Sequence, residues 1–150
     1  MSDSIASFGA KIALVATSTF PAGILITQFA DDADSLDSAS IQLGDAAMGP
    51  NGDMVTWHKP AIIPITLNII PDSVDDINLS ILAENNRVGA GKLSVQDDIT
   101  LVIAYPSGRT ISYSGGMISD AVLGLPSTSA GRMKSKPYSF KFDNIVQVFA

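Results

Sequence analysis

A run of alternating residues, AIIPITLNII at positions 61–70, constrains this chain more than any other feature. Its odd positions, from Ala61 to Ile69, are all apolar, whereas Thr66 and Asn68 are polar. A period of two predicts a β-strand with one face in the core and a mixed face outside. Pro64 has no N–H group to donate to a neighbouring strand, so it indicates an edge position or a bulge.

The length of 150 residues favours one domain over residues 1–150. Residues 1–9 are small and polar, and we expect them to form a flexible or partner-docked arm. No apolar run approaches the roughly 18 residues of a membrane span, and the first residues lack the pattern of a signal peptide. We therefore predict no membrane insertion. The apolar content of 46% favours a surface that is partly buried by neighbouring molecules.

The amino-acid composition argues against most catalytic, metal-binding and cofactor-binding sites. The chain has no Cys and one His, His58, which excludes disulfides, thiolate metal sites and Cys nucleophiles and disfavours a Ser-His-Asp triad. Asp31, Asp32, Asp34 and Asp37 are close together, but the central Gly and terminal Glu of an EF-hand are missing. The Gly residues form no phosphate-binding fingerprint. We therefore expect no enzyme activity, no metal and no cofactor, and the net charge of −6 argues against binding to a phosphate backbone.

Other period-two runs predict further strands. Gly115-Gly116 interrupts one of these runs and indicates a bulge or a close backbone approach. The C-terminal run, residues 138–148, is predicted as one long strand with Tyr138, Phe140, Phe142, Val146 and Val148 on one face, and Met117 is expected to face inward. The remaining expected strands cover residues 10–18, 24–29, 39–43, 54–59, 99–105 and 110–119.

One helix is predicted, from about residue 73 to residue 85. Ser73 is a suitable N-cap, and Asp76 stands three residues later, as in a capping box. A helical stripe consists of Val74, Ile77, Ile81 and Leu82, so we expect this face to pack on the core. The predicted fold class is mainly β (α+β), a small β-barrel or sandwich of antiparallel strands with one flanking α-helix.

Charge is distributed unevenly along the chain. Residues 1–58 hold seven Asp against one Lys, whereas residues 121–150 hold four basic residues against Asp143 alone. In a head-to-tail polymer an acidic region of one copy could meet a basic region of the next. Two loops, residues 30–38 and 44–53, are long and polar, and the second contains the turn signals Gly49-Pro50 and Asn51-Gly52.

Two segments carry a family resemblance: FPAGILITQFADDADSLDS near the N-terminus and GDAAMGPNGDMVTWHKPAIIPITLNIIPDSVDDINLSIL in the middle, followed by the paired C-terminal strands. In this order of elements the chain resembles the tail tube proteins of contractile-tailed bacteriophages, which are similar in fold to type VI secretion and pyocin tube proteins. The resemblance implies six copies per ring and rings stacked into the inner tail tube. A tube-terminating baseplate or adaptor protein, or a type VI secretion-like tube protein, is the alternative.

The resemblance also implies partners and contacts. The chain would assemble with itself and with tail sheath, baseplate and tape-measure proteins, in a virion made in the bacterial host cytoplasm. Genomic DNA would pass through the lumen without specific binding. Tail tubes generally use an extended hairpin loop to reach the next ring, and the basic loop 132–136 is a natural electrostatic counterpart. The expected contact residues are Asp31, Asp32, Asp34, Gly44, Asp45, Met48, Gly49, Pro50, Asn51, Gly52, Asp53, Arg132, Lys134 and Lys136.

Overall fold

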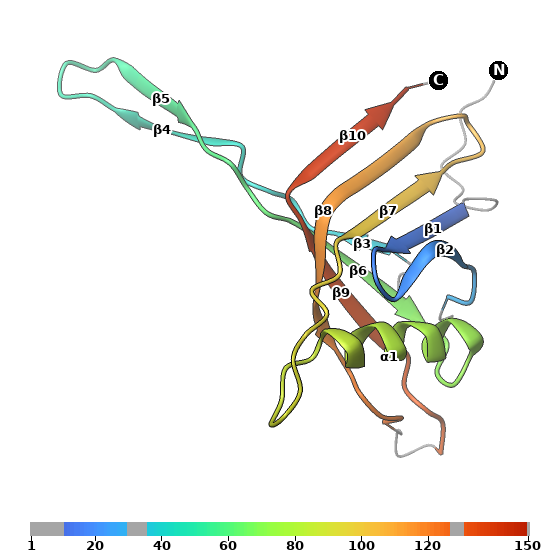
Figure 1. The fold of residues 1–150 in the computed structure, drawn as a ribbon. Coiled ribbons are helices and arrows are strands. Elements are labelled where there is room, and N and C mark those ends of the chain that lie inside the picture. Colours follow the sequence, from blue (N-terminus) through green and yellow to red (C-terminus); the bar gives the residue numbers. More distant parts are fainter. Residues whose placement is uncertain (1–10, 30–35, 127–130, 150) are drawn as a thin grey trace.

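The computed structural model describes residues 11–29, 36–126 and 131–149 (Figure 1). Residues 1–9 and the predicted contacts Asp31, Asp32 and Asp34 lie outside the described residues. The elements, in chain order, are β1 (Lys11–Ala16), β2 (Phe20–Ile26), β3 (Leu36–Ser38), β4 (Gly44–Met48), β5 (Met54–His58), β6 (Ile63–Ile69), α1 (Val74–Asn86), β7 (Ile99–Ala104), β8 (Thr110–Ala121), β9 (Lys136–Phe142) and β10 (Asn144–Val148).

Two antiparallel layers share the long strand β8. Its first half lies between β7 and β10, and the layer continues through β1 to β2. Its second half pairs with β9, and that layer continues through β6 to β3. The order ends at β2 on one side and β3 on the other, so the described strands form an open sandwich and not a closed barrel. The mainly β fold with one helix is therefore confirmed, and the sandwich is the form adopted.

The bend in β8 lies at the predicted glycine pair. Leu101 of β7 faces Tyr113, but Ile99 faces Gly116, so β8 carries one extra residue between these pairs. Gly115 has a φ of 64°, and a Cβ atom on Gly116 would lie 2.2 Å from the Phe142 ring. The predicted bulge is confirmed. It also reverses the alternation beyond it, which is why Met117 points outward and its predicted inward orientation is wrong.

The alternating run at residues 61–70 forms β6. Ile63, Ile65, Leu67 and Ile69 are buried, as predicted. The neighbouring strand β3 ends where Ser38 faces Ile65, so Pro64 lies just beyond that ladder and is paired on its other side with Lys141. On the side of β3, Pro64 therefore occupies an edge position, as its missing N–H group had indicated.

The C-terminal strand is not continuous. It divides at Asp143 into β9, which pairs with β6 and β8, and β10, which pairs only with β8. Tyr138, Phe140 and Phe142 are buried, but Val146 and Val148 are exposed, so the prediction of one shared face is wrong beyond Asp143. The chain changes layers there, and a continuous alternation cannot be maintained across the change. The predicted strand at 39–43 is also wrong, because the short strand of this region is β3.

Helix α1 begins as predicted but presents a different face. The Ser73 side chain accepts a hydrogen bond from the Asp76 backbone N–H at 3.2 Å. Val74, Ile77 and Ile81 are 65%, 50% and 46% exposed, whereas Leu79, Leu82 and Ala83 are buried. The predicted packing of the first three is therefore wrong; only Leu82 of the predicted stripe lies in the core.

The orientation of α1 follows from two buried carboxylates in its first turn. Asp75 Oδ2 accepts hydrogen bonds from the backbone N–H groups of Thr27 (2.7 Å) and Gln28 (2.9 Å), just after β2. Asp76 faces β9 and accepts a hydrogen bond from Tyr138. Because a buried carboxylate needs these partners, the two contacts set the rotation of the helix about its axis. The outer apolar stripe is left on the surface as a consequence.

Candidate assembly surfaces

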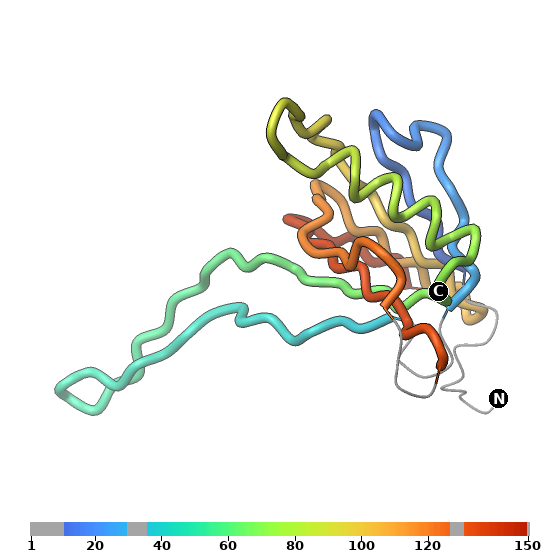
Figure 2. The backbone as a smooth tube through the Cα atoms, turned by 90° about the horizontal axis from the view of Figure 1, so that it is seen from below, coloured from blue at the N-terminus to red at the C-terminus, as the bar shows by residue number. Residues whose placement is uncertain are grey.

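Strands β4 and β5 form a hairpin that projects from the sandwich, and we call residues 44–58 the hairpin arm (Figures 1 and 2). Gly44 pairs with His58 at its base, and Met48 pairs with Met54 near its tip. Gly44 and Gly49 are half-buried, and every other residue of the hairpin arm is exposed. The predicted loop 44–53 is therefore one strand and the turn of this hairpin, while the predicted strand at 54–59 is confirmed as β5.

The turn at the tip is closed by two backbone hydrogen bonds. The Gly49 N–H donates to the Asp53 carbonyl at 2.6 Å, and the Gly52 N–H donates to the Gly49 carbonyl at 3.0 Å. Pro50 occupies the second turn position, where its fixed φ is favourable, and Gly52 adopts a φ of 85° that favours glycine. The turn signals in the sequence thus hold the tip in a defined shape.

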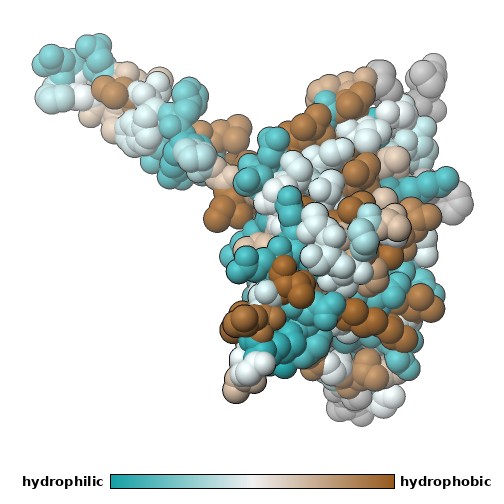
Figure 3. All heavy atoms as spheres, viewed as in Figure 1, coloured by the Kyte–Doolittle hydropathy of each residue, from teal (hydrophilic) through white to brown (hydrophobic). Residues whose placement is uncertain are grey.

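Both faces of the hairpin arm carry exposed apolar side chains. On one face Trp57 and Val55 lie opposite Asp45 and Ala47, and the other face carries the Met48–Met54 pair. These four larger side chains are between 45% and 70% exposed. Figure 3 shows hydrophobic residues among hydrophilic ones along the arm, and more hydrophobic residues at its base. A two-stranded hairpin has marginal stability in water on its own, and exposed apolar surface indicates protein contacts.

The base of the hairpin arm is narrow. Residues 39–43 and 59–62 connect it to the sandwich outside any strand, and the Lys59 N–H donates to the Leu43 carbonyl at 3.2 Å. At Gly44 a Cβ atom would lie 2.7 Å from the Trp57 carbonyl oxygen, so the two strands approach too closely for a side chain. Leu43 and Ile62 are 70% and 63% exposed, which extends the apolar surface to the base.

The predicted basic loop divides into two parts. Arg132 and Lys134 are exposed, and the Lys134 N–H donates to the Pro126 carbonyl at 2.8 Å. Lys136, by contrast, is 2% exposed, so its prediction as a surface contact is wrong. It is the first residue of β9 and shares the inward face with Tyr138 and Phe140. Strand alternation therefore turns it into the protein.

Lys136 belongs to a buried polar network under α1. Its Nζ lies 3.0 Å from Asp76 Oδ1 and 3.3 Å from Ser80 Oγ. The Tyr138 hydroxyl donates to Asp76 Oδ1 at 2.5 Å and lies 2.7 Å from Ser80 Oγ. Burial, together with the neighbouring Asp76 carboxylate, raises the pKa of Tyr138. These groups satisfy one another, so the network binds the helix to β9 and offers no unpaired group for chemistry.

A second carboxylate joins the β1–β2 turn to the segment before β7. Asp97 accepts hydrogen bonds from the Ser18 N–H at 2.6 Å, from the Thr19 N–H and hydroxyl, and from the Asn86 amide at 2.9 Å. Burial alone would raise the pKa of Asp97, but these hydrogen bonds outweigh it and lower the pKa. Asp97 is 5% exposed and connects chain segments far apart in sequence.

Two other kinds of site are absent from the part of the chain that the structure describes. No three His, Asp or Glu side chains come together there as a group that could hold a metal ion. No helix within the described ranges is long and apolar enough to cross a membrane.

Comparison with known families assigns the chain. A family described as tail fiber protein gp32 matches residues 3–146, which is nearly the whole sequence. The chain belongs to this gp32 family. No curated protein gives a significant match to this family member.

Solved structures resemble this gp32-family chain along its whole length. The sheath/tube terminator of an extracellular contractile injection system, PVC, has a TM-score of 0.58 at 11% identity, with 99% of each chain covered. The tube-terminating cap of the anti-feeding prophage has a TM-score of 0.58 at 10% identity, with 100% of this chain and 95% of that chain covered. A chain of the anti-feeding prophage baseplate has a TM-score of 0.56 at 8% identity, with 99% of this chain and 98% of that chain covered. The gp32-family chain thus has a tail-tube-like fold.

Sequence reasoning missed two features of this gp32-family surface. One is the strand character of residues 44–48, although Asn51-Gly52 between two apolar segments is a hairpin signal. The other is the exposed outer stripe of α1, which the helical periodicity had assigned to the core. The structure brings Gly44, Asp45, Met48, Pro50, Asn51 and Asp53 together in the hairpin arm, but within one chain it does not bring them to Arg132 and Lys134.

Proposed function

We propose that this protein is a structural virion component that assembles as stacked hexameric rings to form the inner tube of a contractile phage tail. The hairpin arm is the observation that supports this proposal most. It projects from the sandwich, each of its faces carries exposed apolar side chains, and the described part of its own chain covers neither face. A surface of this kind is ordered and buried when another molecule packs on it.

The arm also indicates how copies join. If the arm of one copy packs on the sandwich of the next copy, the contact joins two different surfaces and is heterologous. Heterologous contacts repeat and give rings or filaments, whereas a self-complementary patch closes into a dimer and stops. We propose that Gly44, Asp45, Met48, Gly49, Pro50, Asn51, Gly52 and Asp53, with Arg132 and Lys134, make contacts between rings or subunits. Asp31, Asp32 and Asp34 are proposed for the same role.

The proposal extends to the particle. Residues 1–150 would act as one domain, made in the bacterial host cytoplasm and incorporated into the virion. Tail sheath, baseplate and tape-measure proteins would be its partners, and the genome would pass through the lumen without specific binding. The role is structural and not enzymatic. The terminator and cap proteins that share the fold favour a second candidate, a protein that ends the tube.

Electron microscopy and native mass measurement of the purified protein test the proposal. Six chains of 15.7 kDa give a ring of about 94 kDa, and stacked rings appear as tubes of uniform width. Discrete rings that never stack would favour the terminator. A variant in which a short Gly-Ser linker replaces residues 44–58 should stay folded and form no tubes. A wild-type protein that stays monomeric at high concentration would contradict both candidates.

A further inference from the structure

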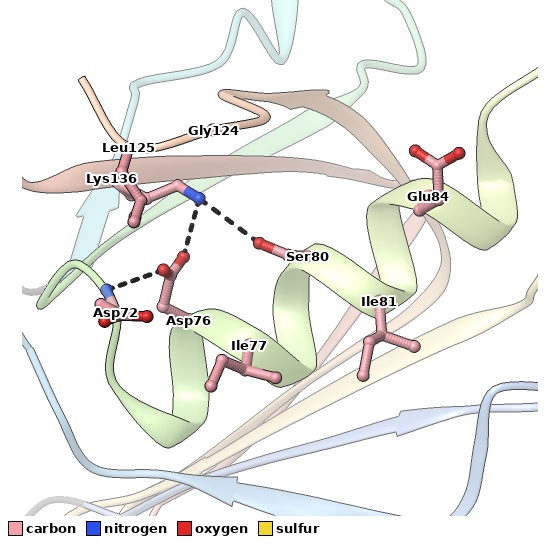
Figure 4. Close-up of a pocket in the computed structure, with 9 residues that line it drawn as sticks. All are labelled: Asp72, Asp76, Ile77, Ser80, Ile81, Glu84, Gly124, Leu125 and Lys136. Carbon is pink, nitrogen blue, oxygen red and sulfur yellow. Dashed lines mark hydrogen bonds and ion pairs between the residues drawn. The ribbon is translucent and has the colours of Figure 1, made fainter.

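The outer side of α1 forms a groove with residues 122–126, the segment that follows β8 (Figure 4). Its volume is about 370 Å³. Ile77 and Ile81 of the helix and Leu125 of the opposite segment form apolar walls, and each is about half exposed, at 50%, 46% and 47%. A surface helix usually turns polar residues outward, so this apolar outer stripe indicates a contact surface.

The floor of the groove is polar but already satisfied. Asp76, Ser80 and Lys136 lie there, and Figure 4 shows their side chains directed toward one another. Within the described residues, no buried side-chain nitrogen or oxygen lacks a hydrogen-bond partner. The floor therefore has no unmet need for a polar ligand, and the available stabilisation comes from the apolar walls. The occupant that fits is an apolar side chain carried by another polypeptide.

The rim of the groove carries charges of both signs. Asp72 and Glu84 belong to its lining, and Glu84 is paired with Arg87 at 2.8 Å, whereas the segment beyond Leu125 is basic. Leu125 is followed by Pro126, whose carbonyl accepts a hydrogen bond from the Lys134 N–H at 2.8 Å. This bond holds the exposed residues Arg132 and Lys134 next to the wall formed by Leu125. An occupant that combines an apolar group with a carboxylate would match both features.

The tip of the hairpin arm has this combination. Met48 and Met54 lie directly opposite each other and are 70% and 66% exposed. Asp53 stands in the adjoining turn and is exposed, whereas Asp45 lies on the opposite face of the arm, across from Trp57. Methionine side chains are unbranched and adapt to irregular apolar surfaces. Leu93 is also strongly exposed, at 87%, but fits less well, because it follows Lys92 and has no carboxylate within three residues.

The tip cannot reach the groove of its own chain. Figures 1 and 2 both show the hairpin arm extending away from the sandwich and from α1. We infer that the groove between α1 and residues 122–126 receives the Met48–Met54 tip of the hairpin arm of a second copy, with Asp53 facing Lys134. This inference rests on the proposed function and adds to it the site that receives the arm.

Cysteine cross-linking tests the contact directly, because the chain has no Cys of its own. A disulfide needs Cα atoms about 4.4–6.8 Å apart, so only neighbouring positions couple. The Met48→Cys, Leu125→Cys double variant should give a ladder of covalent multimers on mild oxidation. A mixture of the two single variants should give mainly heterodimers. The matched control pairs Met48→Cys with Leu25→Cys, since Leu25 is also exposed, at 63%, but lies on the edge strand β2.

A charge exchange gives a second readout that needs no cross-link. Lys134→Glu alone and Asp53→Lys alone should each raise the protein concentration needed for assembly several-fold. The double variant should restore most of the loss, because the two charges are exchanged and still attract. Both positions are exposed, so the variants should fold normally.

The outcomes separate this inference from the proposed function. Normal tubes in which position 48 couples no better to position 125 than to position 25, without rescue in the charge exchange, would overturn the groove contact and leave the tube proposal intact. Specific coupling in solution from a protein that forms no tubes would support the contact and contradict the tube. Specific coupling together with tubes would support both.

Discussion

The sandwich and the hairpin arm of this protein differ in whether their own chain buries their apolar side chains. In the sandwich, Leu14, Leu67 and Phe140 are among many fully buried side chains, and the buried carboxylates of α1 have hydrogen-bond partners. In the hairpin arm, Met48, Val55 and Trp57 are all exposed. The sandwich therefore contains its own stabilising contacts, whereas the arm displays apolar surface whose burial requires another molecule.

This contrast teaches where each substitution should be measured. A change in the sandwich acts on the free energy of unfolding of a single chain. A change in the arm removes contacts that form only between chains, so its effect appears in assembly.

Breaking the buried ion pair should have the largest effect. Lys136→Ala leaves the Asp76 carboxylate buried without its cation, and removing one partner of a buried pair typically costs about 3–5 kcal/mol in the free energy of unfolding. Lys134→Ala, two residues earlier and exposed, should change it by less than about 0.5 kcal/mol. Urea unfolding followed by far-UV circular dichroism measures both. Equal losses in the two variants would contradict the separate environments of these lysines.

Substitutions of two neighbouring apolar residues of α1, Leu82 and Ile81, should also differ strongly in their effect on the free energy of unfolding. Leu82→Ala opens a cavity in the core and should lower the free energy of unfolding by about 2–5 kcal/mol. Ile81→Ala removes a half-exposed side chain and should cost less than about 1 kcal/mol. Thermal and urea unfolding of the matched pair give the comparison. The reverse order would show that the helix packs through the stripe predicted from its periodicity.

Asp97 should make stability depend on acid. Its pKa is lowered in the folded protein, so its contribution is complete above the ordinary Asp pKa near 3.9 and is lost as the pH falls through the lower folded-state value. At pH 7, Asp97→Asn weakens these hydrogen bonds and should cost about 1–3 kcal/mol. The difference in the free energy of unfolding between wild type and Asp97→Asn should become smaller below about pH 4.

The control for this experiment is the next residue. Asp98 is exposed, so Asp98→Asn should leave both the stability at pH 7 and its acid dependence close to wild type. Unfolding curves at a series of pH values between 3 and 7 compare the three proteins. A constant difference between wild type and Asp97→Asn down to the lowest pH would refute the assigned role of the Asp97 charge.

The smallest effect on the single chain is expected in the hairpin arm. Val55→Ser should change the free energy of unfolding by less than about 0.5 kcal/mol, because its side chain is already 55% exposed, but should impair assembly. Trp57 is the only tryptophan and lies on the same face of the arm. Its emission should shift to shorter wavelength when wild-type protein assembles and shift less in the variant. An unchanged emission in wild-type tubes would show that this face stays in water.

Several local features could be predicted from the sequence alone. The alternation of β6, the Ser73 cap and the Gly115-Gly116 bulge were all found where the residues indicated. The turn signals between Gly49 and Gly52 also lie at the tip of a defined turn. Each of these features depends on residues within a few positions of one another, so its physical cause is contained in a short segment.

Only the tertiary structure decided which surfaces these elements share. Val74, Ile77 and Ile81 form a good helical stripe, yet Asp75 and Asp76 rotate α1 so that the stripe faces outward. Lys136 lies in a basic segment but pairs with a carboxylate 60 residues earlier in the chain. Periodicity reports which residues of an element lie on one face; which face is buried depends on partners that are distant in sequence and meet only in the folded protein.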